Sequence, residues 1–167
     1  VNIKGMTLTR ILGNYPEELR PAVVKAIHDF EHTMVYPVMP GVYDFLSSLR
    51  AEGISTAIVT SSDSVKMDYL FGQHPGFASF FDVIINGSMV SRSKPDPEGY
   101  LKAAAAVGVD PADCLVFEDS IQGLQAGRAS GARVIGLATT FPRERIEPLA
   151  DMVIKSFEGL SFSDLMG

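Results

Sequence analysis

Three hydroxyl-bearing residues follow the first apolar stretch that could form a strand. Thr60, Ser61 and Ser62 come directly after residues 54–59. Hydroxyl groups beside backbone N–H groups at the start of a helix can hold phosphoryl oxygens. The alternative is a helix N-cap, for which Ser and Asp are preferred. With Asp63, however, the run holds more capping-type residues than one helix needs. Both interpretations stay open from these residues alone.

A second candidate is Lys94, which stands directly before Pro95. Proline fixes its own φ angle and restricts the residue before it, so the lysine is presented on a stiff turn. A lysine held in this way can neutralise a phosphate and a nearby carboxylate. The alternative is a solvated surface lysine, which describes most lysines in proteins.

The third candidate is the pair Glu118-Asp119, which follows the apolar stretch 114–117. Carboxylate oxygens are hard ligands that suit Mg²⁺, which takes one or two carboxylates and keeps waters or substrate oxygens. The alternative has Asp119 and Ser120 capping the next helix while Glu118 interacts with its dipole. The pair therefore predicts either a magnesium site or a helix start.

The elements that must position these residues alternate along the chain. Apolar periodicity and turn residues predict helices at 41–52, 65–71, 97–107, 121–130 and 143–149, and strands at 55–59, 82–85, 114–117, 133–137 and 152–154. Short apolar strands separated by helices are typical of a parallel sheet covered on both faces. Ligands bind at the carboxyl ends of such strands, so Thr60, Lys94 and Glu118-Asp119 are expected to converge.

The first 36 residues read as helical, and Pro37 and Pro40 then break the pattern. We therefore expect two parts, residues 1–36 and residues 37–167. The helix predicted after Asp119 holds Gly123 and Gly127, which we attribute to close packing of that helix on the sheet. The three histidines have no ligand-like spacing and are expected to be ordinary residues: His28, His32 and His74.

Composition limits the class of protein. The chain has 167 residues, 46% hydrophobic and 20% charged, with a net charge of −6. The acidic balance argues against nucleic acid as a partner, and the longest apolar run, 103–109, is too short to span a membrane. One cysteine, Cys114, and the lack of an apolar leader indicate a cytoplasmic protein. The sequence favours no particular oligomeric state.

The three candidates follow one another along the chain as hydroxyl residues, Lys-Pro and an acidic pair. In this order they resemble the motifs of the haloacid dehalogenase superfamily of phosphohydrolases, in its β-phosphoglucomutase-like branch. The matching positions are Thr60, Lys94-Pro95, and Phe117-Glu118-Asp119-Ser120 with Gly123. The resemblance implies a three-layer, Rossmann-like α/β core at 37–167. It also implies that residues 1–36, including Lys4-Gly5-Met6-Thr7, are the later part of a helical cap.

The resemblance also implies a mechanism. In this superfamily an aspartate of an Asp-x-Asp motif attacks phosphorus, its second aspartate acts as general acid/base, and Mg²⁺ bridges nucleophile and phosphate. Thr60, with Ser61 and Ser62, would bind the phosphoryl group, and Lys94 would neutralise charge. Asp119 would hold Mg²⁺, with Glu118 as a further ligand or its partner.

The resemblance fails at one point, because no Asp-x-Asp occurs in these 167 residues, which begin with Val1 rather than Met. In the superfamily that motif lies on the central strand, upstream of the cap. We therefore expect a fragment that lacks this strand and is inactive alone, with an unpaired ladder on two neighbouring strands.

The expected activity is a Mg²⁺-dependent phosphatase acting on a small phosphorylated metabolite, with a sugar phosphate favoured. A sugar-phosphate mutase is the alternative, but the positions after Thr7 and Thr60 offer Leu8 and Asp63 where mutases tend to offer positive or amide donors. A non-catalytic phospho-ligand-binding domain is less favoured. Receiver domains place their acidic pair first, which is the opposite order. A dehalogenase proper is disfavoured because Lys94 and the acidic pair suit phosphate and metal.

Overall fold

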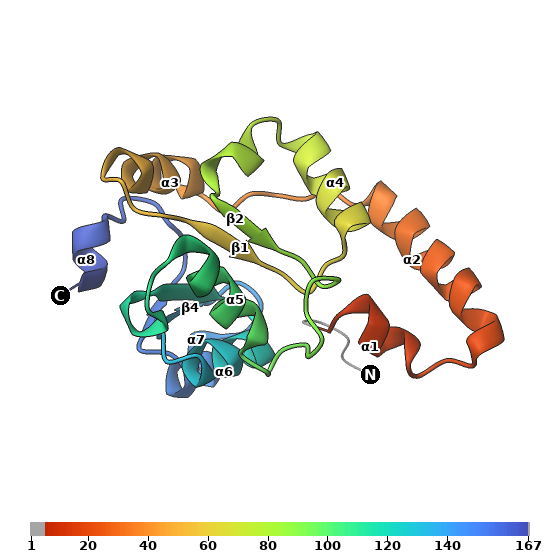
Figure 1. Ribbon diagram of the computed structural model, residues 1–167. Helices are drawn as coiled ribbons and strands as arrows, with labels where there is room; N and C mark the ends of the chain where they lie inside the picture. Colours follow the sequence, from red (N-terminus) through yellow and green to blue (C-terminus); the bar gives the residue numbers. More distant parts are fainter. Residues whose placement is uncertain (1–5, 167) are drawn as a thin grey trace.

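The computed structural model describes residues 6–166, which form a parallel α/β fold (Figure 1). Its strands are β1 (Ala57–Val59), β2 (Val83–Ile85), β3 (Leu115–Glu118), β4 (Arg133–Leu137) and β5 (Met152–Ile154). Its α-helices are α1 (Leu8–Leu12), α2 (Arg20–Thr33), α3 (Val42–Ala51), α4 (Ser64–Gln73), α5 (Glu98–Val107), α6 (Ile121–Ala129), α7 (Arg143–Ile146) and α8 (Phe162–Met166). Four 3₁₀ turns complete it: η1 (Glu17–Leu19), η2 (Phe77–Phe80), η3 (Pro111–Asp113) and η4 (Glu147–Leu149). No helix among these residues could cross a membrane.

The predicted α/β class is confirmed, and each predicted strand lies within two residues of an observed one. The helix predicted at 143–149 is shorter, because α7 ends at Ile146 and continues as η4. Helix α8 was not predicted, since five residues are too few to show a helical period. It packs beside α3.

The N-terminal segment is less regular than the sequence predicts. Residues 1–5, with Lys4 and Gly5, lie outside the described residues. The helical pattern breaks between α1 and η1, where the Asn14 amide donates to the Arg10 and Ile11 carbonyls at 3.3 and 3.2 Å. Such side-chain bonds compete with continuation of the helix. Helices α1 and α2 lie at one end of the molecule, and α2 packs against α4 (Figure 1).

The strands form two separate parallel sheets rather than one. The first pairs β1 with β2, with Val59 beside Ile85, and the second has the order β3-β4-β5, with Glu118 beside Gly136. Among residues 6–166 no strand joins β1 to β3.

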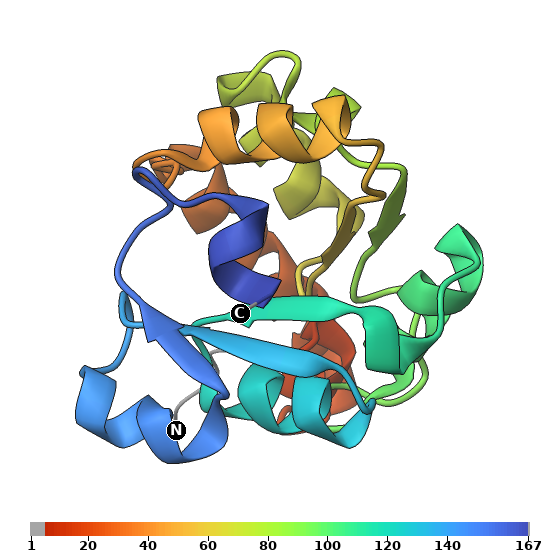
Figure 2. The same cartoon turned by 90° about the vertical axis from the view of Figure 1, so that its left-hand side faces the viewer.

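Strand β4 shows the layers most clearly, because successive side chains point to opposite faces. Val134 packs with Leu124 of α6 and Ile146 of α7. The next residue, Ile135, packs on the other face with Phe45 of α3. Figure 2 shows α3 on one side of the β3–β5 strands and α6 and α7 on the other.

Helix α6 approaches the sheet closely at Gly127. A Cβ atom at this position would lie 3.0 Å from Val116 Cγ1 and 3.1 Å from Val134 Cγ2. The explanation of this glycine by close helix–sheet packing is therefore confirmed, whereas Gly123 proves to have a different neighbour, described below.

Candidate functional site

The loop after β1 holds the three predicted hydroxyl residues. The Thr60 amide donates to the Ile85 carbonyl at 2.9 Å and so extends the β1–β2 ladder by one residue. The Thr60 hydroxyl accepts from the Ser62 amide at 3.1 Å. Asp63, not Thr60, is the N-cap of α4, because its carboxylate accepts from the Lys66 amide at 3.0 Å. The capping alternative therefore does not account for Thr60.

Gly87, which sequence reasoning missed, supports this loop from the end of β2. Its amide donates to the Ser62 carbonyl at 2.7 Å. A Cβ atom here would lie only 2.4 Å from the Ser61 carbonyl oxygen, so only glycine allows this approach. The one signal in the sequence was its position just past a predicted strand.

Lys94 is enclosed rather than solvated, since its side chain is 11% exposed. Its ammonium group donates to the carbonyl of Val59, the last residue of β1, at 3.1 Å. It also forms an ion pair with Glu118, the last residue of β3, and lies 4.8 Å from the centroid of the Tyr100 ring. The surface-lysine interpretation is wrong, because this ammonium group connects the ends of both sheets.

A second missed residue, Glu98, fixes the turn before Lys94. Its carboxylate accepts from the Ser91 amide at 3.0 Å, the Ser91 hydroxyl at 2.8 Å and the Arg92 amide at 2.8 Å. It also pairs with Lys102 at 2.7 Å. The Lys102 ammonium and then the Ser91 donors hold the pKa of Glu98 far below its usual range. Glu98 therefore stays charged and keeps this turn in place.

Glu118 is buried at the centre of a hydrogen-bond network. Besides Lys94, its carboxylate accepts from the Tyr100 hydroxyl at 2.7 Å and from the Ser120 hydroxyl at 3.0 Å. Burial and then the Glu118 charge raise the pKa of Tyr100 well above its usual range, so its hydroxyl remains a donor. Together these donors hold the Glu118 carboxylate in place at the end of β3.

Asp119 and Ser120 have separate roles at the start of α6. Ser120 is the N-cap, because its hydroxyl accepts from the Gly123 amide at 3.0 Å. Asp119 stands directly before this N-cap. Its Oδ2 atom accepts from the Thr140 hydroxyl, which comes from the loop after β4. Thr140 is thus a further neighbour of the site that the sequence did not indicate.

The predicted residues meet as one group at the carboxyl ends of β1 and β3. Thr60, Ser61 and Lys94 line a small cavity of about 10 Å³ together with the buried Thr7 of the N-terminal segment. Lys94 lines this cavity and also forms the ion pair with Glu118, the residue directly before Asp119. Ser62 does not line the cavity and instead contributes backbone bonds.

Position 123 must be glycine because the Glu118 carboxylate occupies the space that a side chain at this position would need. A Cβ atom at this position would lie 2.0 Å from the Glu118 carboxyl carbon. We expect Gly123→Ala to lower the free energy of unfolding by about 1–3 kcal/mol, because Glu118 must leave its donors. Gly72→Ala in α4 is the matched control, since its Cβ would meet nothing within 4 Å. Alanine there should be neutral or stabilising in the same urea titration, and an equal loss in both variants would contradict this role of Gly123.

The histidine prediction needs one correction. Side-chain atoms of His28, Glu31 and Asp63 all lie within 4.8 Å of one another. His28 Nε2 is 2.8 Å from the Asp63 carboxylate, and Glu31 pairs with Lys66 at 3.1 Å. Helix α2 brings His28 to Asp63 at the start of α4, a contact between distant segments that local spacing cannot reveal. It fastens α2 to the loop that holds Thr60.

Comparisons with known proteins point to one family. A family model described as haloacid dehalogenase-like hydrolase matches residues 8–131. The chain is 30% identical over 91% of its length to the bifunctional riboflavin kinase/FMN phosphatase of Arabidopsis thaliana, and covers 44% of that protein. It is 36% identical over 64% of its length to the protein CbbY of Rhodobacter capsulatus, and covers 48% of it. The chain thus spans about half the length of these curated relatives.

Two further similarities concern a phosphatase and a solved structure. Hexitol phosphatase B of Escherichia coli K12 is 29% identical over 90% of this chain, which covers 67% of that enzyme. The crystal structure of CbbY from Rhodobacter sphaeroides, in complex with phosphate, matches with a TM-score of 0.76 at 27% identity. That match covers 90% of this chain and 68% of CbbY.

Proposed function

Because this chain is a member of the haloacid dehalogenase-like hydrolase family, we propose that it forms the phosphate-binding part of a Mg²⁺-dependent phosphatase. The substrate is a small phosphorylated metabolite, with a sugar phosphate favoured, and the reaction passes through a phosphoaspartyl intermediate. The observation that carries the proposal is Lys94, whose ammonium group lies beside Thr60 and connects Val59 to Glu118. Further support comes from hexitol phosphatase B and from a CbbY structure with xylulose-1,5-bisphosphate.

Thr60 and Ser61 bind the phosphoryl oxygens in this proposal. The Thr60 hydroxyl already accepts from the Ser62 amide, so its own proton is left to donate to a phosphoryl oxygen. Ser62 positions the loop through its backbone bonds to Thr60 and Gly87. Lys94 neutralises the charge that gathers on phosphate and nucleophile during transfer.

The donor set fits a magnesium ion through Asp119. Mg²⁺ is held in proteins by one or two carboxylates with waters and substrate oxygens. Thr140 orients the Asp119 carboxylate, as outer residues commonly do for metal ligands. The Glu118 oxygens already accept from Lys94, Tyr100 and Ser120, so Glu118 acts as a partner that positions Lys94. A bound Mg²⁺ would supply Lewis-acid stabilisation of the phosphoryl group.

The nucleophilic aspartate is assigned to a strand outside these 167 residues, which contain no Asp-x-Asp. The break between β1 and β3 supports this assignment. We call the longer polypeptide that holds this strand the complete protein, and we propose that the 167-residue chain alone is inactive. In the same proposal residues 1–36 belong to a cap, residues 37–167 to the core, and the protein is cytoplasmic.

Arg10 favours hydrolysis over a mutase reaction. Its guanidinium group donates to the Lys94 carbonyl at 3.2 Å and to the Ser93 hydroxyl at 3.4 Å. These two bonds come from one nitrogen of the guanidinium group and fasten α1 to the Lys94 turn. In this proposal Arg10 therefore holds that turn rather than a second phosphate of a substrate.

Products distinguish the two reactions. The complete protein with Mg²⁺ should release inorganic phosphate from at least one member of a panel of hexitol phosphates, sugar phosphates and sugar bisphosphates. Phosphate is measured by colour reaction, and isomers by chromatography of the remaining sugar phosphate. Isomer formation without phosphate release would establish the mutase, whereas ligand binding without either product would establish a non-catalytic domain.

A further inference from the structure

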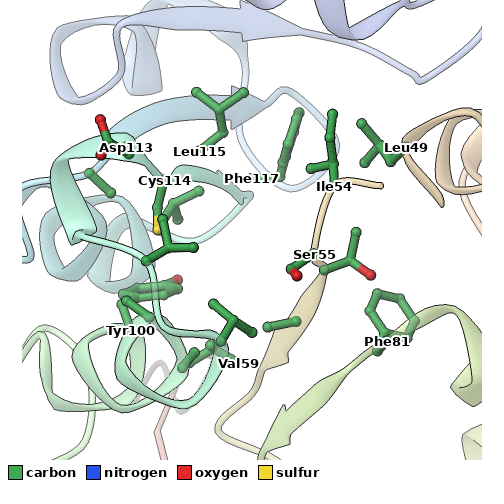
Figure 3. Close-up of a pocket in the computed structure, with 18 of the residues that line it drawn as sticks. Leu49, Ile54, Ser55, Val59, Phe81, Tyr100, Asp113, Cys114, Leu115 and Phe117 are labelled. Carbon is green, nitrogen blue, oxygen red and sulfur yellow. The ribbon is translucent and has the colours of Figure 1, made fainter. Parts of the chain in front are cut away.

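Metal-ligating side chains gather at one place outside the proposed phosphate site. Among the described residues, one set of three His, Cys, Asp or Glu side chains has donor atoms within 4.8 Å of one another, namely His28, Glu31 and Asp63. The largest cavity of these residues, about 550 Å³ between the two sheets, is instead lined mainly by apolar side chains such as Leu115 and Phe117 (Figure 3). The ligand set lies elsewhere, where α2 packs against α4.

Helix α2 supplies two of the three ligands and the N-cap of α4 supplies the third. His28 and Glu31 are three residues apart on α2, so they share one face of the helix. Helical metalloproteins use the same spacing to present an imidazole and a carboxylate to one ion. Asp63 is fixed as the N-cap, because its Oδ1 accepts from the Lys66 amide at 3.0 Å. Its Oδ2 lies 2.8 Å from His28 Nε2.

The distances and the burial suit a small divalent ion. Four-coordinate Zn²⁺ with bonds of about 2.0–2.1 Å holds its ligand atoms about 3.3 Å apart. The 2.8 Å separation of His28 and Asp63 is close to this value, and Glu31 needs a shift of roughly 1–2 Å. The side chains of His28, Asp63 and Glu31 are 22%, 19% and 13% exposed, so the ligands are enclosed while an ion and a water can still reach them.

The ligand types and the charge select the kind of ion. Imidazole suits Zn²⁺ and similar transition metals, whereas Mg²⁺ is held by oxygen ligands. Lys66 now occupies part of the site, since its ammonium group lies 3.1 Å from Glu31 Oε1. Two carboxylates and one ammonium group leave a negative balance when His28 is neutral. Lys66 is 30% exposed and has a flexible stem, so it can turn into water when a divalent ion takes its place.

We propose that His28, Glu31 and Asp63 form a binding site for Zn²⁺ or a similar borderline divalent cation, with water completing the coordination. The site goes beyond the proposed function, because it uses neither Asp119 nor the residues that bind phosphate. A bound ion joins α2 to the start of α4 by bonds to both elements. It therefore strengthens the attachment of α2 to the loop that holds Thr60.

Calorimetry with zinc chloride tests the site on the 167-residue chain. Cys114→Ser is introduced throughout, because the one thiol of the chain would compete for the ion, and excess Mg²⁺ keeps oxygen-only sites occupied. One equivalent of Zn²⁺ should bind, and His28→Gln should weaken the binding about tenfold or more. His32→Gln is the matched control, since His32 lies one turn later on α2 against the Tyr69 ring and should leave the affinity unchanged. Absence of binding, or equal affinity in these two variants, would overturn the proposal.

A second pair of variants tests the competition between Lys66 and the ion. Lys66→Met should strengthen Zn²⁺ binding about threefold or more, because a positive charge 3.1 Å from Glu31 is removed. Lys25→Met on the same helix is the control, since Lys25 pairs with Asp29 and both side chains are mostly exposed. It should change the affinity by less than about twofold. An unchanged or weaker affinity in Lys66→Met would contradict coordination by Glu31.

Asp63→Asn separates loss of the ligand from loss of the fold. Asparagine caps a helix as well as aspartate does, so α4 keeps its start, but the neutral amide should bind Zn²⁺ about tenfold or more weakly. Zn²⁺ should raise the midpoint of thermal unfolding of the chain and have little effect on this variant, because a ligand of the native state stabilises it.

Asp119→Asn distinguishes this site from the proposed magnesium site and should retain the Zn²⁺ affinity. Loss of Zn²⁺ binding in Asp119→Asn, with retention in Asp63→Asn, would place the ion at Asp119 and overturn the inference. Such a result would leave the proposed function standing, because these measurements do not depend on phosphate release.

Discussion

Replacing Lys94 with methionine should lower the free energy of unfolding by about 3–5 kcal/mol. The side chains of Lys94 and Glu118 are 11% and 10% exposed, and removal of one partner from a buried ion pair leaves an uncompensated charge. Methionine keeps much of the apolar length of lysine, so the loss reports mainly on the charge. Urea unfolding of the 167-residue chain measures it.

Two controls make this result specific to the buried pair. Lys25→Met removes an ion pair with Asp29 in which both side chains are mostly exposed, and it should change stability by less than about 0.5 kcal/mol. Adding Glu118→Gln to Lys94→Met should restore part of the lost stability, because the unpaired charge is removed. A loss below about 1 kcal/mol for Lys94→Met alone would mean that this pair does not hold the two sheet ends together.

Replacing Asp119 with asparagine should reduce phosphate release by the complete protein about 100-fold or more. In the proposed function Asp119 is the carboxylate that holds Mg²⁺, and removing one charge-stabilising group of this kind has effects of that size. The Mg²⁺ concentration needed for half-maximal activity should rise as well. Steady-state rates over a Mg²⁺ titration measure both effects.

Two further variants test whether the Asp119 result is specific to the metal site: Thr140→Val, which removes a neighbour of Asp119, and Asp68→Asn, which serves as a control. Thr140 orients the Asp119 carboxylate, so its loss should weaken the Mg²⁺ response by about 10- to 100-fold. Asp68 is exposed on α4, and its replacement should leave the activity unchanged. If Asp119→Asn kept its activity and its Mg²⁺ response, Asp119 could not be the metal ligand.

The sequence predicted the arrangement of the site better than its details. Strand ends can be placed from apolar runs, and the parallel α/β pattern then brings Thr60, Lys94 and Glu118 to one edge. Sequence spacing does not reveal which donors a buried carboxylate collects. The Tyr100 and Thr140 hydroxyls reach Glu118 and Asp119 from elements distant in the chain.

The residues that were missed share a physical reason. Gly87 and Gly123 are needed because another group approaches their Cα atoms, namely the Ser61 carbonyl and the Glu118 carboxylate. Glu98 fixes its loop because its carboxylate accepts three hydrogen bonds, from the Ser91 amide, the Ser91 hydroxyl and the Arg92 amide. These requirements arise only after folding, whereas the capping preferences of Asp63 and Ser120 are local and could be anticipated.

Phosphate release by the complete protein, measured with and without Mg²⁺, tests most directly whether these residues form one magnesium-assisted phosphate site. The account predicts release that stops when EDTA removes Mg²⁺, returns when Mg²⁺ is restored, and falls strongly in Thr60→Val at saturating Mg²⁺. Release that continues undiminished in EDTA, or that is as fast in Thr60→Val as in the unmodified protein, would contradict it.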